Sequence, residues 1–264
     1  MGLILSVKRK ADVYDQGSLE SREVSVVREE PLTVFLNNAE LATMICSPSG
    51  YKELTVGFLI SEGLLQKPED LVDIRLQEEM GVIWVETAEP VPQTSNFLRR
   101  HIASCCGKGR AGLYFINDAQ QLTPVETSKM FKADDLLKLI KMLDQGSDIF
   151  RLTGGVHSAA LGDEAGLVKM YEDIGRHNAV DKVLGHAFLN RIDTSSKCLI
   201  LSGRIASEIL IKGARANIPL ILSRSAPTEL TLKLAEELEI TVVGFARGER
   251  LTIYTNPERV IKYA

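Results

Sequence analysis

The run Lys197-Cys198-Leu199-Ile200-Leu201-Ser202-Gly203-Arg204 opens the stretch of sequence that decides the fold. Its apolar segment is short and ends in serine and glycine, as expected of a buried strand followed by a turn. The pattern recurs downstream, with segments of helical apolar spacing in between. The expected strands are 197–201, 219–222, 240–243 and 251–254, and the expected helices are 207–216 and 228–238. This alternation is typical of a three-layer α/β domain with a largely parallel sheet.

The first hundred residues show a different pattern, rich in predicted strands with one helix. Two apolar runs flank Asn37-Asn38, a combination that predicts a hairpin. The expected strands are 32–36, 41–45 and 81–86, and the expected helix is 51–65. A further helix, expected at 131–143, comes after this region. The periodicity breaks within 118–132. We therefore expect a smaller β-rich N-terminal domain over residues 1–125, ending in a cysteine-containing loop, and the α/β domain over residues 126–264.

Composition narrows the class of protein. The chain has 264 residues, of which 45% are hydrophobic and 25% charged, as in ordinary globular proteins. A net charge of −4 argues against a general nucleic-acid binder. No apolar run approaches the roughly 20 residues that span a bilayer. The first ten residues place their charges after a very short apolar run, unlike a secretory signal. The sequence therefore predicts a cytoplasmic protein with no membrane partner.

The cysteines fall into two kinds. The chain has four, too few for a disulfide scaffold of this length, and the apolar or turn surroundings of Cys46 and Cys198 indicate structural roles. Cys105 and Cys106 are adjacent and are followed by Gly-Lys-Gly-Arg, in a stretch (90–117) that has no carboxylate. Neighbouring cations favour the thiolate, so this loop suits nucleophilic or sulfur-carrying chemistry. A basic loop with two incidental cysteines explains the same spacing.

A metal centre is not indicated by these residues. Adjacent cysteines point in different directions and rarely chelate one ion, and no second Cys-x-x-Cys or His-x-x-x-His pair completes a tetrahedral set. His101 beside the two cysteines does not change this. We expect no protein-ligated metal.

A second group of candidate residues lies in two neighbouring motifs. Thr153-Gly-Gly-Val-His-Ser-Ala-Ala160 has a glycine pair able to present backbone N–H groups, and Glu172-Asp-Ile-Gly-Arg-His-Asn-Ala-Val-Asp-Lys182 gathers donors near a predicted helix start. The candidate ligand-binding side chains are His157, Arg176, His177 and Asn178. A charged surface helix with ion pairs is the alternative explanation.

A third group lies where the predicted strands end. Ligands of open α/β sheets bind at the carboxyl ends of strands. Three successive ends carry serine, glycine or arginine: Ser202-Gly203-Arg204, Ser223-Arg224-Ser225 and Phe245-Ala246-Arg247-Gly248-Glu249-Arg250. We predict a shared anion-binding pocket there. None of the three matches a phosphate-loop or full Gly-x-Gly-x-x-Gly motif, so the motifs alone do not assign the ligand.

With these residues the chain closely resembles the formate dehydrogenase accessory sulfurtransferase family, FdhD/NarQ. The strongest match is Thr153–His157 followed by Glu172–Lys182. Supporting matches are 57–63, 202–205, 225–228 and 243–245, so that the resemblance runs from about residue 29 to 255.

The resemblance implies a sulfur carrier. In such proteins a loop cysteine takes persulfide sulfur from a cysteine desulfurase and passes it to the molybdenum bis(guanine dinucleotide) cofactor, which formate dehydrogenase requires in sulfurated form. It also implies a cytidine-deaminase-like second domain and a cofactor-binding stretch at Phe245–Arg250. The chemistry of the residues points to the same kind of ligand as the resemblance does, since arginines at three strand ends suit the phosphates of a guanine nucleotide.

The cysteine loop departs from the family pattern. Many members carry Cys-Gly-x-Cys-Gly; Cys106-Gly107 fits the first pair, but the second cysteine position falls on Gly109. Cys106 is therefore the persulfide candidate, and Cys105 is an additional cysteine. A mechanism that needs two cysteines three apart cannot operate in this chain.

Three other functions would require different residues. A non-catalytic chaperone that binds the molybdenum cofactor and docks formate dehydrogenase predicts that Cys106 is dispensable and Arg247 is not. A zinc deaminase needs His-x-Glu and Pro-Cys-x-x-Cys, and neither occurs. A cysteine hydrolase would need His157 or His177 as the base for Cys106. Exposed apolar edges expected in the N-terminal β region also favour a homodimer.

Overall fold

The computed structural model describes residues 5–88 and 122–262 of the chain. The C-terminal part is built on a six-stranded sheet in the order β13-β12-β11-β10-β8-β9. Its strands are β8 (His157–Asp163), β9 (Gly166–Asp173), β10 (Cys198–Leu201), β11 (Leu220–Ser223), β12 (Thr241–Arg247) and β13 (Arg250–Ile253). Every residue of β10 and β11 is buried, which explains why these strands are continuous apolar runs.

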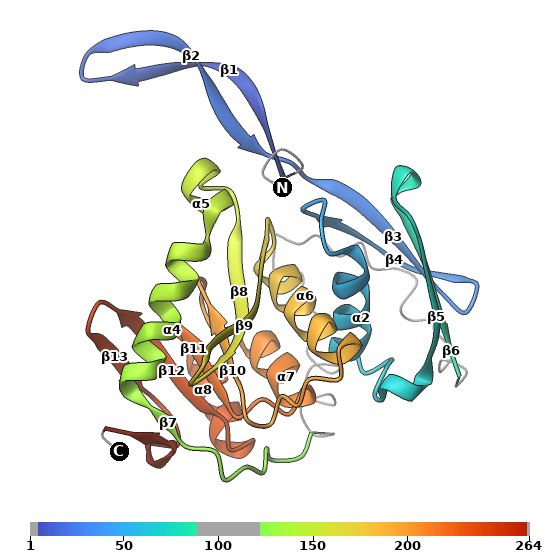
Figure 1. The fold of residues 1–264 in the computed structure, drawn as a ribbon, viewed down its shortest axis with the longest axis vertical. Coiled ribbons are helices and arrows are strands. Elements are labelled where there is room, and N and C mark those ends of the chain that lie inside the picture. Colours follow the sequence, from blue (N-terminus) through green and yellow to red (C-terminus); the bar gives the residue numbers. More distant parts are fainter. Residues whose placement is uncertain (1–4, 89–121, 263–264) are drawn as a thin grey trace.

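Helices cover both faces of this sheet (Figure 1). They are α4 (Ala133–Gly146), α5 (Asp148–Thr153), α6 (Arg176–Leu189), α7 (Ser207–Arg215) and α8 (Glu229–Glu237). Helix α4 packs on one face through Leu136, Leu139 and Leu143. Helices α6, α7 and α8 bury their apolar residues against the other face. The expected three-layer α/β architecture is therefore confirmed.

The direction of the strands differs from the expectation. Only the central strands β10, β11 and β12 run parallel, whereas β8, β9 and β13 pair antiparallel with their neighbours. The prediction of a largely parallel sheet was wrong at both edges. The reason is that hairpins, rather than crossover helices, connect β8 to β9 and β12 to β13, and a tight turn reverses the chain.

The N-terminal part is β-rich with a single α-helix among its described residues. A four-stranded sheet has the order β4-β3-β6-β5. Its elements are β3 (Glu30–Leu36), β4 (Ala39–Cys46), α2 (Tyr51–Ser61), β5 (Leu71–Gln77) and β6 (Val82–Thr87), with 3₁₀ turns at Pro68–Asp70 and Glu78–Met80. The predicted hairpin is confirmed, and both Asn37 and Asn38 have the positive φ of a tight hairpin turn.

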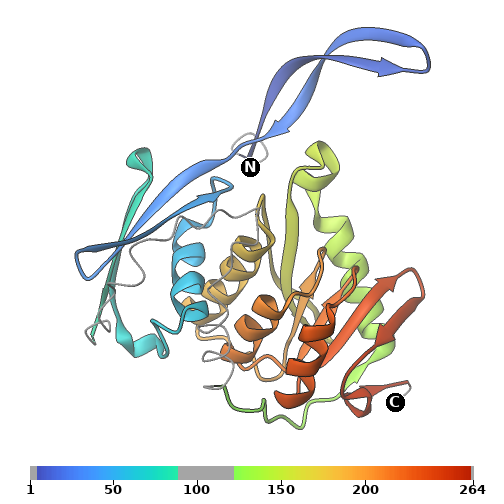
Figure 2. The same ribbon diagram turned by 180° about the vertical axis from the view of Figure 1, so that it is seen from behind.

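Helix α2 joins the two parts. Nine of its eleven residues are buried, so it has no solvent face of its own. One side packs on the four-stranded sheet, and the other lies along α6 (Figures 1 and 2). An ideal Cβ at Gly57 would lie 1.8 Å from the Asp181 carbonyl oxygen, and one at Gly185 would lie 1.9 Å from that of Glu53. The two helices therefore touch backbone to backbone.

A long hairpin extends from this body. Strands β1 (Ser6–Asp15) and β2 (Ser18–Val27) pair along their full length, and most of their side chains are exposed. The hairpin projects as a twisted ribbon, and only its base contacts α5 (Figure 1). Two short strands, β7 (Phe131–Lys132) and β14 (Val260–Ile261), also pair with each other. Strand β14 follows a 3₁₀ turn at Pro257–Arg259 near the C-terminus.

The domain boundary predicted at residue 125 falls beside the undescribed range. The Val125 side chain is 1% exposed in the core formed with α6, α7 and α8, and its N–H donates to the Leu238 carbonyl. Leu122 and Val125 thus already belong to the C-terminal core, whereas the predicted N-terminal domain ends at residue 125. Within the described ranges, no helix is long and apolar enough to cross a membrane.

Candidate functional site

The predicted strand-end residues lie on one edge of the large sheet. Because β10, β11 and β12 are parallel, their carboxyl ends share that edge. His157 joins them, since antiparallel β8 begins there and its Ala159 pairs with Leu201. Hydrogen bonds connect the successive loops: the Ser158 N–H donates to Ser202 Oγ (2.9 Å), and the Ser223 hydroxyl donates to the Gly203 carbonyl (2.6 Å).

At one end of this edge, Gly203 separates His157 from Arg176. An ideal Cβ on Gly203 would lie 3.4 Å from His157 Nδ1 and 3.8 Å from Arg176 Cδ. The two side chains therefore approach the same strip of backbone. His157 is half-buried, and its pKa is lowered by burial and by the Arg176 cation. It is therefore a neutral ring at neutral pH, able both to donate and to accept.

Arg176 is the first residue of α6, and no charged side chain pairs with it within residues 5–88 and 122–262. Its Nε is buried and has no hydrogen-bond partner among the described residues, and the ion pairs found in the described ranges do not include it. A partly buried guanidinium without an acceptor is costly, and an anionic ligand would relieve that cost.

His177 follows Arg176 in the first turn of α6. Its Nε2 is 3.4 Å from Glu208 Oε2. Burial, followed by the cations of Lys212 and Arg176, lowers the pKa of His177 to about 3. The Glu208 carboxylate would raise the pKa of His177, but it is 40% exposed and therefore screened by solvent. The effect of burial on the pKa is the larger of the two. His177 is therefore also neutral at physiological pH.

Asn178 faces away from this edge, into the protein. Its amide donates to the Ile45 carbonyl (2.9 Å) and to Asp173 Oδ1 (3.0 Å), and the side chain is buried. Asp173 also pairs with Lys182 at 2.6 Å, with both side chains fully buried. Much of the predicted donor cluster is thus an internal network that holds α6 against the β4–α2 turn, and the alternative of a charged surface helix is wrong.

The segment Phe245–Arg250 forms the other end of the edge, where β12 turns into β13. Phe245 is 45% exposed and has a positive φ of 49°, within a bulge between Gly244 and Arg247. Arg247, Gly248, Glu249 and Arg250 are exposed, and Arg247 Nε donates to the Arg224 carbonyl (2.9 Å). Ala246 points into the core and is 0% exposed, so only its backbone faces a ligand.

Between the two ends, the arginines differ in availability. Arg224 is paired with Asp144 on α4 at 2.9 Å. Arg204 is exposed and takes part in none of the ion pairs found in the described ranges. Sequence reasoning missed the role of Asp144, because nothing in the helical pattern of α4 shows that its last turn reaches this edge.

The predicted sulfur-carrying residues, Cys105 and Cys106, lie outside the described residues. Cys46 and Cys198 are both 0% exposed, and burial raises the pKa of each thiol to about 12. Both are therefore unreactive packing residues, as expected. Within residues 5–88 and 122–262, no three His, Cys, Asp or Glu side chains gather as metal ligands would.

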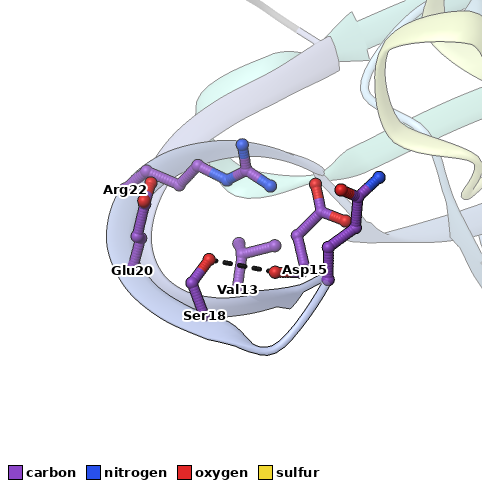
Figure 3. Close-up of a pocket in the computed structure, with 6 residues that line it drawn as sticks. Val13, Asp15, Ser18, Glu20 and Arg22 are labelled. Atoms are coloured by element: carbon purple, nitrogen blue, oxygen red, sulfur yellow. Dashed lines mark hydrogen bonds between the residues drawn. The ribbon is translucent and has the colours of Figure 1, made fainter.

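A shallow hollow is present elsewhere, at the tip of the β1–β2 hairpin. It is lined by Val13, Asp15, Gln16, Ser18, Glu20 and Arg22, and the Ser18 hydroxyl donates to the Asp15 carbonyl at 2.9 Å (Figure 3). The curl of an exposed ribbon forms it, and none of the predicted site residues lines it. The cationic sheet edge is the better candidate site.

The fold and this edge define a class: a three-layer α/β protein with arginines and neutral histidines along the edge of its sheet where the parallel strands end. The chain belongs to the FdhD/NarQ family, whose sequence profile matches residues 27–261. It is 43% identical to the sulfur carrier protein FdhD of Bacillus pumilus over 97% of this chain and 98% of that protein. It is 41% identical to the sulfur carrier protein FdhD of Bacillus subtilis, with 94% of each chain covered.

A solved structure supports the same fold. The crystal structure of a protein assigned as a formate dehydrogenase accessory protein, from Desulfotalea psychrophila, superposes with a TM-score of 0.81 at 27% sequence identity. The match covers 97% of this chain and 100% of the other. The resemblance inferred from the motifs is therefore confirmed over nearly the whole length.

Proposed function

We propose that this protein is a cytoplasmic sulfur carrier that moves persulfide sulfur from a cysteine desulfurase to a molybdenum cofactor destined for formate dehydrogenase. The observation that carries the proposal is the similarity, over almost the full length, to curated relatives named sulfur carrier protein FdhD. The likeness to a formate dehydrogenase accessory protein supports the choice of client.

Cys106 is the proposed persulfide carrier, with Cys105 as its neighbour. Of the four cysteines, two are buried with pKa values raised to about 12, which leaves this pair for sulfur chemistry. The carboxylate-free, glycine-containing sequence around Cys106 favours a reactive thiolate. A desulfurase persulfide attacked by this thiolate would pass on its outer sulfur and leave as a thiolate, which balances the exchange.

The molybdenum bis(guanine dinucleotide) cofactor is the proposed sulfur acceptor and is treated as a bound substrate. We propose that it binds along the cationic edge, with Phe245–Arg250 at one end, Ser202, Gly203 and Arg204 in the middle, and His157, Arg176 and His177 at the other. Asn178 supports this edge from within. A homodimer is also proposed, since Tyr14 and Leu19 of the β1–β2 hairpin are more than two-thirds exposed.

The proposal is tested by intact-protein mass spectrometry after incubation with a cysteine desulfurase, cysteine and pyridoxal phosphate. Wild type is compared with Cys106→Ala and, as the matched control, Cys105→Ala. We expect wild type and Cys105→Ala to gain one sulfur mass and Cys106→Ala to gain none. If wild type gains no sulfur while formate dehydrogenase still matures with Cys106→Ala, a non-catalytic cofactor chaperone is the better account.

A further inference from the structure

The β1–β2 hairpin carries a strand edge that is open to another strand. Strand β1 pairs with β2 along one side, and no further strand among the described residues joins this two-stranded sheet. The ribbon projects from the body of the protein (Figures 1 and 2), and it is fixed at its base, where Val27 lies against Gly155. A two-stranded ribbon alone is marginally stable in water, and a free edge is a template for pairing. The outer edge of β1 is therefore a surface on which another strand can add.

The charges along β1 are separated by sign. Lys8, Arg9 and Lys10 lie toward the base of the ribbon, whereas Asp12 and Asp15 lie toward its tip. Charged side chains on an exposed edge usually keep other strands away. A strand with opposite charges in its two halves is nevertheless complementary to a second copy of itself that runs in the opposite direction. This pattern favours a second copy of the chain as the partner.

Two-fold symmetry leaves few registers for such a pair of strands. Opposite residues of antiparallel strands have their side chains on the same face, so the symmetry axis must pass beside a residue that faces its own copy. An axis at Lys10 or at Asp12 would place like charges against each other. An axis at Ala11, the small uncharged residue between them, places Lys10 of one copy opposite Asp12 of the other. The sequence of β1 thus favours one register and disfavours its immediate neighbours.

The side chains on the outer face of the ribbon fit the same register. The hollow at the tip is lined by Val13, so the even-numbered residues of β1, including Asp12 and Tyr14, point to the opposite face (Figure 3). Tyr14 is 73% exposed there. In the register centred on Ala11, Tyr14 would lie opposite Lys8, and an ammonium group beside an aromatic ring is favourable. The exposed tyrosine therefore gains a partner in the register that also pairs the charges.

We infer that the protein forms a two-fold symmetric dimer in which the β1 edges of two copies pair antiparallel about Ala11, giving a four-stranded sheet. This inference specifies the homodimer proposed above and rests on that part of the proposed function. Each arm is ten residues and about 33 Å long, so the two bodies lie at opposite ends of the paired arms. The family profile begins at residue 27, where the arm ends, so the contact is additional to what that profile describes.

The test is sedimentation equilibrium of the full-length chain with two complementary charge reversals. The first, Asp12→Lys, places two lysines against each other at each contact of the dimer. The second combines Lys10→Glu with Glu23→Lys, because Lys10 faces Glu23 within the hairpin and the double change keeps an opposite pair there. Between copies, it places two carboxylates against each other. Glu20→Lys is the matched control, since it makes the same reversal as Asp12→Lys but on β2.

Wild type and Glu20→Lys are expected to approach the mass of two chains as the concentration rises. Each reversed variant alone should have a dimer dissociation constant about tenfold or more above that of wild type, because two symmetric ion pairs become repulsive. An equimolar mixture of the two reversed variants should dimerise about as tightly as wild type. In that mixed dimer, a lysine faces a carboxylate at both contacts.

The inference is overturned if wild type sediments as a single chain up to about 0.1 mM, or if the mixture does not recover although both variants unfold at the temperature of wild type. It is also overturned if Glu20→Lys weakens the dimer and Asp12→Lys does not, because the pairing would then involve β2. Sulfur loading of Cys106 on the same samples separates this result from the carrier function. Normal loading of a monomeric wild type would overturn the inference alone, and absent loading of a dimeric wild type would overturn the carrier function alone.

Discussion

Lys182 Nζ lies 2.6 Å from the Asp173 carboxylate, and both side chains are completely buried. The same carboxylate accepts hydrogen bonds from the Ser47 and Gly175 N–H groups, and Lys182 donates to the Ser47 carbonyl. The pair thus connects the end of β9, the start of α6 and the turn between β4 and α2. It fixes the helix start from which Arg176 and His177 project.

The first prediction concerns this ion pair. Lys182→Met should lower the free energy of unfolding by about 3–5 kcal/mol, because it leaves the Asp173 charge buried without its partner. Lys233→Met removes an exposed lysine paired with Glu229 on α8 and should leave the stability essentially unchanged, because solvent screens that pair. Urea unfolding at neutral pH measures both. Equal, small losses for the two variants would show that Asp173 does not need Lys182.

A second prediction concerns the contact between α2 and α6. Gly185→Ala should destabilise the protein by about 3 kcal/mol, the upper end for overpacking, because the new methyl group would meet the Glu53 carbonyl and force the helices apart. Gly213→Ala is the matched control on helix α7, where the methyl group would meet the end of the Ile221 side chain at 3.2 Å. Thermal unfolding compares them. A Gly185→Ala protein as stable as Gly213→Ala would contradict the close helix contact.

The third prediction is a pH dependence. His177 stays neutral in the folded chain down to about pH 3, whereas its ordinary pKa is 6.5. Between these values the unfolded chain binds the additional proton, so stability should fall as pH decreases from about 6.5. His177→Gln should reduce this slope by up to about 1.4 kcal/mol per pH unit. The pKa of His186 is lowered less, so His186→Gln should change the slope less. Urea unfolding at pH 7, 6 and 5 measures how the stability of each variant depends on pH. If His177→Gln has the same pH dependence as wild type, His177 is not a buried neutral ring.

The fourth prediction concerns thiol reactivity. Cys46 and Cys198 have pKa values raised from 9.0 to about 12, so at pH 8 their thiolate fractions are about a thousandfold below that of an ordinary cysteine. Iodoacetamide should therefore modify only Cys105 and Cys106 in the native protein. Peptide mass spectrometry locates the label, and a urea-unfolded sample, in which all four react, is the control. Native labelling of Cys46 would contradict the role assigned to its environment.

The sequence predicted the centre of the fold well because its strands are buried on both faces. Apolar runs such as 198–201 and 220–222 permit few interpretations, and the helices between them show clear apolar spacing. The hairpin β8–β9 was missed because, apart from Leu161, the stretch from Ser158 to Gly162 in its first strand consists of small residues that resemble a loop. The β1–β2 hairpin was missed because its residues are mostly exposed, so no apolar alternation marks it.

The candidate site was predicted in part. The sequence indicated that the strand ends carry arginines, and the parallel strands do bring them to one edge. It could not separate Arg176, whose buried Nε has no hydrogen-bond partner in the described part of the chain, from Asn178, which is buried and bonded. That distinction depends on α2 covering one side of α6, a contact between residues more than a hundred positions apart. Spacing within one motif contains no information about such a contact.

The last prediction concerns Phe245, whose positive φ of 49° is rare for a large side chain. Strain of this kind often marks a functional position, and the exposed ring at the end of β12 could stack on a guanine base. Phe245→Gly and Phe245→Ala both remove the ring, but only glycine removes the strain. Phe245→Gly should therefore be about 1 kcal/mol more stable than Phe245→Ala, while both bind GDP about tenfold more weakly than wild type. Urea unfolding and GDP titration measure the two effects on the same samples. If the alanine variant is the more stable, the strain is absent; if either variant binds GDP like wild type, the ring has no part in binding the base.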